Sequence, residues 1–358
     1  MNLEYINLKS ESQKKEVKEF LKILDLEYEA GMDSTIVMRN NDYKIVATAS
    51  KNKNVIKCFG IDLTMRGEGL ANIMLTELIN KSFQEGNYHN FLFTKPSNLE
   101  IFTGIGFKVI SKTDKVAFLE IGIQNIEKTI EKIKNDIFIE LEDKRKARVE
   151  GDLLDKPRSM IVMNCNPFTL GHLFLIEQAS KNSREVLVFI VEEDKSVFPF
   201  EVRYELVKEG TKHLENVVVI RGTEYIISSA TFPSYFLKKE DDTMLEYIKL
   251  DVTVTAEHFC KKLNIKRRYV GEEPYCEITK KYNETMKVIL EKNLIEVVEI
   301  PRKEKNNKAI SASEVRELMK EGKEKQLEEM VPKITYDFIM SEKSRGIKES
   351  IQKLNSFC

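Results

Sequence analysis

The chain has 358 residues, a length that suits two domains of common size better than a single core. Its 57 basic and 58 acidic side chains leave a net charge of −1, so no overall field favours nucleic acid or an anionic membrane. Five cysteines without a CxxC pair argue against a disulfide framework or a zinc site. No signal peptide or membrane-length apolar run is visible, so we expect a cytoplasmic protein without nucleic-acid or membrane partners.

The first 122 residues predict a compact α+β domain. Residues 55–63 and 91–94 are strand-like, and 70–83 are helix-like. Leu70, Met74 and Leu78 fall on one face of that helix, as expected of a helix that covers a sheet. We place the boundary of this domain at residue 122.

Residues 123–155 predict a connecting helix and linker. Ile126, Ile130, Ile133 and Ile137 are spaced four, three and four apart, and the residues around them are mostly charged. This pattern gives one apolar stripe that packs on a neighbouring domain. A coiled-coil seam between two chains is the alternative, but it needs more heptads than this segment has.

From residue 156 to 345 short β-branched runs alternate with helical stretches. The predicted strands are 160–164, 185–191, 217–220, 268–270 and 295–300, and the predicted helices are 171–180, 201–213, 252–263 and 279–292. Such alternation predicts a Rossmann-like parallel sheet covered on both faces, followed here by a short tail, 346–358. Parallel sheets of this kind bind ligands at the carboxyl ends of their strands, so chemistry is sought directly after each strand.

The first strand of this domain runs into the segment CNPFTLGH, residues 165–172. Thr169 is a plausible N-cap, Gly171 allows close approach of a phosphate to the backbone, and His172 falls in the first helical turn. Residues 169–172 resemble the T/HxGH motif of the nucleotidyltransferase superfamily. Read alone, the tetrapeptide favours a capped helix start with an incidental histidine, because such short motifs also match by chance.

Two further segments occur in the order that this superfamily shows. Residues 310–316, ISASEVR, resemble its ISxSxxR pattern, in which Ser311 and Ser313 cap a helix and Arg316 reaches phosphate oxygens. Between the motifs, Lys195 and Arg203 frame a K…F…R stretch at the place of a phosphate-binding lysine and a second basic residue. The alternative for ISASEVR is a capped helix with a surface arginine.

Adenylyl transfer requires ATP to be positioned and the charge on its phosphate oxygens to be neutralised. The resemblance implies that His172, Lys195 and Arg316 are the catalytic residues. Mg²⁺ is expected with ATP, carried largely by phosphates and water, so no protein metal site is expected. The ATP- and phosphate-binding set that the motifs imply is Asn166, Thr169, Gly171, His172, Lys195, Arg203, Gly271, Ser311, Ser313 and Arg316.

Longer stretches resemble one family within the superfamily. Residues 163–172, 228–238 and 271–274 look like the citrate lyase ligase family, and the resemblance covers nearly the whole chain. It implies a ligase that forms a carbon–sulfur bond: ATP, acetate and a thiol give AMP, pyrophosphate and an acetyl thioester, through acetyl-adenylate. The thiol belongs to a coenzyme-A-like prosthetic group on the acyl carrier subunit of citrate lyase. An adenylyltransferase acting on a phosphate-containing cofactor and a non-catalytic nucleotide or acyl-CoA sensor are the alternatives.

The N-terminal domain carries a loop with a resemblance of its own. Residues 66–71, RGEGLA, are similar to the pyrophosphate loop of GNAT acetyltransferases, which implies that Arg66, Gly67, Gly69 and Ala71 bind the coenzyme-A-like arm. Residues 98–107 resemble another GNAT segment, but Phe102 stands where many such enzymes carry a tyrosine acid. Phenylalanine cannot protonate a thiolate, so we expect a binding domain, with a ligand-free structural domain as the alternative.

Overall fold

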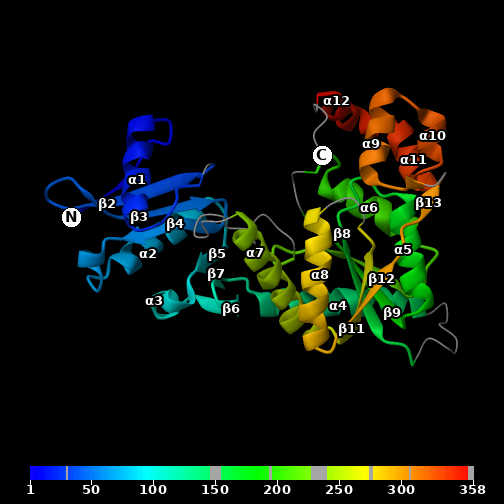
Figure 1. Cartoon of the computed structure of the whole chain (residues 1–358), viewed down its shortest axis with the longest axis horizontal. Coiled ribbons are helices and arrows are strands. Elements are labelled where there is room, and N and C mark those ends of the chain that lie inside the picture. Colours follow the sequence, from blue (N-terminus) through cyan, green and yellow to red (C-terminus); the bar gives the residue numbers. More distant parts are fainter. Residues whose placement is uncertain are drawn as a thin grey trace. The chain divides into compact units, whose positions relative to one another are not determined.

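A computed structural model of the chain describes residues 1–29, 31–145, 155–192, 196–226, 240–273, 277–305 and 308–353. The chain forms two compact units (Figure 1). Unit 1 contains residues 1–129 together with 229–254, and unit 2 contains 130–228 and 255–358. The chain therefore passes from one unit to the other three times.

Unit 1 is built on a seven-stranded mixed sheet with the order β1-β2-β3-β4-β5-β7-β6. Neighbouring strands are antiparallel, except for the parallel pair β4 and β5. The strands are β1 (Asn2–Tyr5), β2 (Ser34–Arg39), β3 (Ile45–Asn52), β4 (Val55–Ile61), β5 (His89–Thr94), β6 (Lys108–Lys112) and β7 (Ala117–Gly122). The α+β fold predicted for this part of the chain is confirmed.

The helices of unit 1 cover the sheet with apolar side chains. They are α1 (Glu11–Ile23), α2 (Leu70–Gln84), α3 (Leu99–Ile105) and the short 3₁₀ turns η1 (Leu63–Met65) and η2 (Pro96–Asn98). Leu70, Met74 and Leu78 of α2 are fully or almost fully buried in one core cluster with residues of β2, β3 and β4, as their spacing predicted. A second cluster packs α1 against the sheet through Val17 and Leu21.

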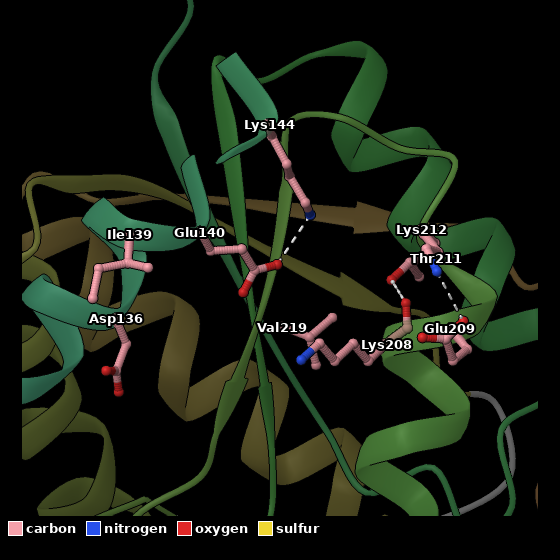
Figure 2. Close-up of a pocket in the computed structure, with 9 residues that line it drawn as sticks. All are labelled: Asp136, Ile139, Glu140, Lys144, Lys208, Glu209, Thr211, Lys212 and Val219. Atoms are coloured by element: carbon pink, nitrogen blue, oxygen red, sulfur yellow. Dashed lines mark hydrogen bonds and ion pairs between the residues drawn. The ribbon is translucent and has the colours of Figure 1, made fainter. Parts of the chain in front are cut away.

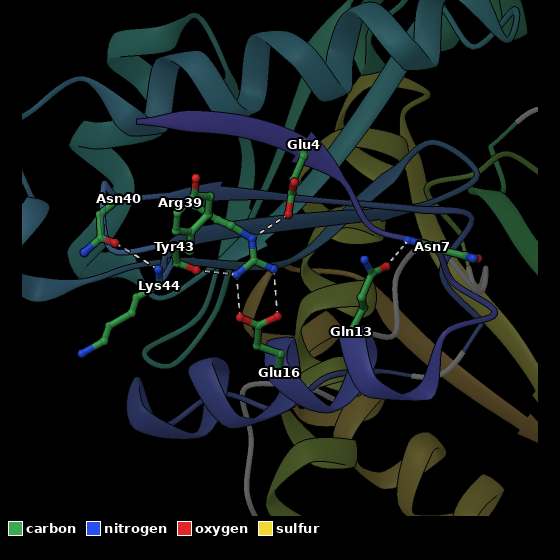
Figure 3. A network of polar contacts seen from close by, with 8 residues as sticks. All are labelled: Glu4, Asn7, Gln13, Glu16, Arg39, Asn40, Tyr43 and Lys44. Carbon is green, nitrogen blue, oxygen red and sulfur yellow. Dashed lines mark hydrogen bonds and ion pairs between the residues drawn. The ribbon is translucent and has the colours of Figure 1, made fainter.

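A charged network ties α1 to the edge of this sheet (Figure 3). The Arg39 guanidinium in β2 donates to Glu4 of β1 at 2.6 Å and, through both terminal nitrogens, to Glu16 of α1 at 2.5 and 2.8 Å. These two carboxylates raise the pKa of Arg39 above its ordinary value, and Arg39 lowers that of Glu16. The bidentate contact fixes the approach of the helix to the strands.

Helix α7 (Glu240–Val254) belongs to unit 1 although it comes from the second half of the chain. It packs on β6, and Thr113 Oγ1 donates to the buried Glu246 carboxylate at 2.6 Å. The sequence predicted a helix over 252–263 in the nucleotide domain. The observed helix begins earlier, at Glu240, and leaves unit 1 at Val254 into a π-helical segment (Thr255–Cys260) of unit 2.

Unit 2 contains a five-stranded sheet with the order β10-β9-β8-β11-β12, in which every pair is parallel. Its strands are β8 (Arg158–Met163), β9 (Glu185–Ile190), β10 (Val217–Arg221), β11 (Ile265–Gly271) and β12 (Glu296–Ile300), and α5 (Leu170–Lys181), α6 (Phe200–Gly210) and α8 (Glu277–Lys292) connect them. The Rossmann-like sheet is confirmed. The strand order reverses at β8, so the crevice after β8 is the place where a ligand is expected.

The last part of unit 2 is a helical cluster (Figure 1). After the hairpin β13 (Glu304–Lys305) and β14 (Lys308–Ala309) come α9 (Ala312–Glu321), α10 (Glu324–Glu328), α11 (Lys333–Met340), η5 (Glu342–Ser344) and α12 (Arg345–Lys353). Their core includes Val315, Leu318, Leu327 and Ile339, and Phe198 from the segment before α6 is buried in the same cluster. The cluster therefore holds α9 beside the segment that leads into α6.

Helix α4 (Ile126–Arg145) carries the predicted apolar stripe. Ile126, Ile130, Ile133 and Ile137 are all at least 95% buried, and Leu141 extends the stripe by one turn. The helix begins in unit 1 and continues in unit 2. Among the described residues, no helix is long and apolar enough to cross a membrane.

Candidate active site

His172 is held by the residue that caps its own helix. Thr169 is the N-cap of α5, and its hydroxyl oxygen accepts from the His172 backbone N–H at 3.3 Å. In return, Nδ1 of the imidazole accepts from the Thr169 backbone N–H at 3.1 Å. Because Nδ1 accepts, the proton of a neutral imidazole lies on Nε2. His172 therefore presents a neutral N–H donor at a helix start, where backbone dipoles also attract anions.

The surroundings of His172 favour its neutral form. Burial is the larger cause, and the charge of Arg302 is the second; together they lower the pKa of His172 to about 4. The ring lies nearly parallel to that of Phe168, with centroids 6.2 Å apart, and part of its surface still reaches solvent. At neutral pH the side chain is therefore a hydrogen-bond donor without a positive charge.

The second phosphate motif lies against the first. Ser311 is the N-cap of α9 and accepts from the Glu314 backbone N–H at 3.1 Å. Arg316, one turn later, donates to the Ser313 hydroxyl at 3.0 Å and to the backbone carbonyl of Asn166 at 2.5 Å. Desolvation lowers the pKa of Arg316 from its ordinary value. The guanidinium nevertheless stays charged at neutral pH. One guanidinium thus joins segments 150 residues apart.

Gly171 packs tightly against the second motif. A Cβ atom at this position would lie 3.1 Å from the backbone carbonyl oxygen of Ile310, the residue before Ser311. A side chain would push the two motifs apart, because a backbone oxygen cannot rotate away. Close phosphate approach was the reason that the sequence suggested for this glycine; the structure adds the packing of the second motif against α5.

Arg203 has a structural role that its motif did not reveal. This side chain in α6 is fully buried, and its guanidinium donates to the backbone carbonyls of Phe198, Asn164 and Val191 at 2.7–2.9 Å. It also donates to Oδ1 of Asn164 at 2.8 Å. Through these bonds Arg203 braces the strand ends and the following segment, and its contact with phosphate stays a prediction.

The structure describes only some of the other residues that were predicted for the site in unit 2. Lys195 and residues 228–238 lie outside the described residues, as does Pro274. The Asn166 side chain accepts from the Phe198 backbone N–H at 2.9 Å, so it ties the TLGH segment to the start of α6. Gly271 ends β11 at the same sheet edge; a Cβ there would meet no described atom within 4 Å.

In unit 1 the predicted loop joins η1 to α2. Gly67 and Gly69 adopt φ angles of 89° and 75°, in the left-handed region that favours glycine, and residues 66–69 are exposed. Gly69 is the N-cap of α2, and no side-chain hydrogen bond caps the first turn of this helix. Phe102 is buried beside Phe59, with ring centroids 5.4 Å apart, and serves the core.

Arg302 was missed by the reading of the sequence. It is the second residue after β12, and its guanidinium donates to the backbone carbonyl of Glu272 at 2.7 Å and pairs with the Glu273 carboxylate. Its charge acts on His172. The sequence feature that could have identified Arg302 as a site residue is its position near the carboxyl end of a predicted parallel strand, where ligands are expected.

A pocket of about 430 Å³ lies elsewhere in unit 2, between α4 and α6 (Figure 2). The charges around it balance, and none of the described motif residues lines it; its walls are Asp136, Ile139, Glu140, Lys144, Lys208, Glu209, Thr211, Lys212 and Val219. Within the described ranges, no group of three or more His, Cys, Asp or Glu side chains could hold a metal ion.

Comparison with known proteins places the chain in a family. Residues 158–339 match the family model of the citrate lyase ligase C-terminal domain. The [citrate [pro-3S]-lyase] ligase of Klebsiella pneumoniae is 34% identical over 93% of this chain and 94% of the relative, and that of Haemophilus influenzae is 36% identical over 90% and 94%. A phosphopantetheine adenylyltransferase of Symbiobacterium thermophilum matches 18% of this chain and 41% of its own length at 36% identity.

Solved structures resemble the N-terminal part. A GNAT-family acetyltransferase of Staphylococcus aureus covers 34% of this chain and 100% of its own, with 16% identity and a TM-score of 0.30. The two ligase relatives, by contrast, extend over both units and nearly their full lengths. By its sequence over that whole length, and by the family model over residues 158–339, the chain belongs to the citrate lyase ligase family.

Proposed function

We propose that this protein uses ATP to acetylate the thiol prosthetic group of the citrate lyase acyl carrier subunit. Acetate attacks the α-phosphorus of ATP through a carboxylate oxygen, the bond to pyrophosphate breaks, and acetyl-adenylate forms. The carrier thiolate then attacks the acetyl carbonyl, and AMP leaves as the thioester forms. The activation step is needed because a free carboxylate is a poor acyl donor.

The main support for this proposal is that Arg316 joins the two phosphate motifs. Its contact with Asn166 brings the start of α9 to the start of α5, so two helix N-termini and two donor side chains converge. His172 supplies Nε2–H, and Arg316 supplies a fixed positive charge. Preorganised donors of this kind stabilise charge on phosphate oxygens without reorganising during the reaction.

Acetate activation also fits the protonation state of the site. A neutral His172 does not titrate near pH 7, so it donates a hydrogen bond throughout the reaction and is not a general base. The reaction needs no general base, because acetate is already ionised at that pH. Mg²⁺ is proposed to enter with the triphosphate, since no described cluster could hold it alone.

Unit 1 is proposed to bind the coenzyme-A-like arm. The support is the exposed loop at residues 66–69 and the helix start at Leu70 that no side chain caps. Lys195 remains a proposed phosphate ligand. A cytoplasmic location is proposed as well, since Cys58, Cys165 and Cys260 are buried free thiols.

Isotope exchange tests the first step. Labelled pyrophosphate should enter ATP when enzyme, Mg²⁺, ATP and acetate are mixed without the carrier, and omission of acetate should abolish the exchange. An adenylyltransferase would need its phosphate-bearing substrate instead, and a sensor would exchange nothing. If a protein that binds ATP shows no response to acetate, with or without a carrier that lacks its thiol, the ligase proposal is wrong.

A further inference from the structure

We propose that Arg302, held in place by Glu273, is a further substrate-binding cation of the nucleotide site and binds an oxyanion of the bound substrates. This inference rests on the proposed function, since the oxyanions in question are those of ATP and acetate. It adds a residue from the end of β12 to a site otherwise built from the starts of α5 and α9.

The backbone brings Arg302 to the site. The Lys303 ammonium lies over the ring of Phe174 in α5 at 5.8 Å, and the Lys303 carbonyl accepts from the Ile310 backbone N–H at 3.0 Å. The Ile310 carbonyl in turn approaches Gly171. Lys303 and Ile310 are thus held against the helix that carries His172, and the electrostatic effect of Arg302 on His172 agrees with this placement.

The side chain of Arg302 is oriented by contacts at the end of the neighbouring strand. Nε donates to the Glu272 carbonyl at 2.7 Å, and Nη2 pairs with the Glu273 carboxylate. Both acceptors follow β11, so the guanidinium spans the carboxyl ends of β11 and β12. The Arg302 and Glu273 side chains are only 26% and 11% exposed, which limits solvent screening of the pair.

The chemistry of the pair favours an anionic ligand. A guanidinium presents its donors in a planar fork that matches carboxylate and phosphate oxygens. Glu273 acts as a positioning residue, since its ion pair with Arg302 restrains the rotation of that fork. The charge of Arg302 acts with the burial of His172 to favour the neutral imidazole.

The test compares Arg302→Lys, which keeps the charge but loses the fork, with Arg302→Gln, which loses both. Arg267→Gln is the matched control, because Arg267 and Glu296 form an ion pair across the same two strands, with Glu296 at the first residue of β12. We expect kcat/KM for ATP in acetate-dependent exchange to fall about 10-fold or more in Arg302→Lys and further in Arg302→Gln. The control should stay within about 2-fold of the wild type.

The KM values identify the oxyanion. A rise confined to the KM for ATP assigns Arg302 to a phosphate, and a rise confined to the KM for acetate assigns it to the carboxylate. Unchanged kinetics for both substrates in a folded Arg302→Gln protein overturn the proposal. If Arg302→Gln does not fold, unchanged kinetics in Arg302→Lys overturn it instead.

A titration separates this inference from the proposed function. The chain has four histidines, so the His172 imidazole is assignable by NMR through a His172 variant. Its pKa should rise in Arg302→Gln and change little in Arg302→Lys or Arg267→Gln. Calorimetric binding of ATP and of inorganic pyrophosphate should weaken in both Arg302 variants. These measurements need no turnover, so a wild type without acetate-dependent exchange would refute the function and still leave Arg302 testable.

Discussion

Arg316 Nη1 lies 2.5 Å from the backbone carbonyl oxygen of Asn166, across 150 residues of sequence. The contact joins the helix start that carries Ser311 to the loop that precedes Thr169. Lysine carries the same charge but cannot donate to Asn166 and Ser313 in one plane. The bridge therefore depends on the shape of the guanidinium as well as on its charge.

Arg316→Lys should lower kcat of the exchange reaction by about 10-fold or more, because the charge remains while its orientation is lost. Exchange kinetics at saturating ATP measure the effect. Arg345→Lys is the control, since Arg345 is an exposed arginine paired with Glu349 within α12. Equal losses in both variants would point to a general effect on the fold.

His172→Ala should reduce turnover on the order of 10²-fold while ATP binding changes little, as for the loss of one preorganised donor. Exchange rates and calorimetric ATP affinity measure the two quantities separately. His213→Ala serves as the control, because His213 is 58% exposed and lies outside the motifs. A folded His172→Ala protein with near-normal kcat would remove His172 from catalysis.

The protonation of His172 should make stability depend on pH. Its folded-state pKa of about 4 lies below the ordinary value of 6.5, so the unfolded chain binds the proton more readily. The stabilising effect is complete above pH 6.5 and is lost as the pH falls towards 4. Relative to His172→Asn, which does not titrate, the wild type should therefore lose free energy of unfolding over this range. Urea denaturation at several pH values measures it, and an equal slope in both proteins would contradict the assignment.

Arg203→Met should lower the free energy of unfolding by about 3 kcal/mol or more, because two buried backbone carbonyls and a partly buried third lose their donor. Urea denaturation measures the change, and Arg221→Met is the control, since its side chain is 49% exposed. If Arg203 bound phosphate instead, the variant would keep its stability and show a raised KM for ATP.

Arg66→Glu should leave acetate-dependent pyrophosphate exchange intact and impair acetylation of the carrier, because the exposed loop belongs to unit 1. Kinetics with the carrier as the varied substrate measure the second step. Lys44→Glu places the same charge change at another exposed position of unit 1 and should have no effect. Unchanged carrier kinetics in Arg66→Glu would mean that the loop is structural.

Local chemistry made part of the site predictable. Thr169 and Ser311 cap helices as expected, since a cap depends on residues within one turn of each other. The five parallel strands were also recognised, because each is a short β-branched run between helical stretches. These features require no knowledge of distant contacts.

Tertiary contacts account for what the sequence did not reveal. Arg203 looks like a surface base in its motif, but the backbone carbonyls that surround it come from three separate segments. Arg302 belongs to no recognised motif and gains its place through Glu273 and the packing of Lys303 on Phe174. The sequence also could not show that α7 packs on the sheet of unit 1. The periodicity of a helix shows which of its faces is apolar, but it does not show which element covers that face.

The membership of α7 in unit 1 has a consequence for how the protein can be divided. A fragment that ends at residue 129 would lack the helix that covers β6 and would leave Thr113 without its Glu246 acceptor. A fragment that begins at residue 130 would carry α7 without the sheet on which it packs. The two units are therefore not separable by one cut in the chain: unit 1 takes α7 from sequence that lies beyond residue 129, so it cannot be inherited or exchanged as one uninterrupted piece.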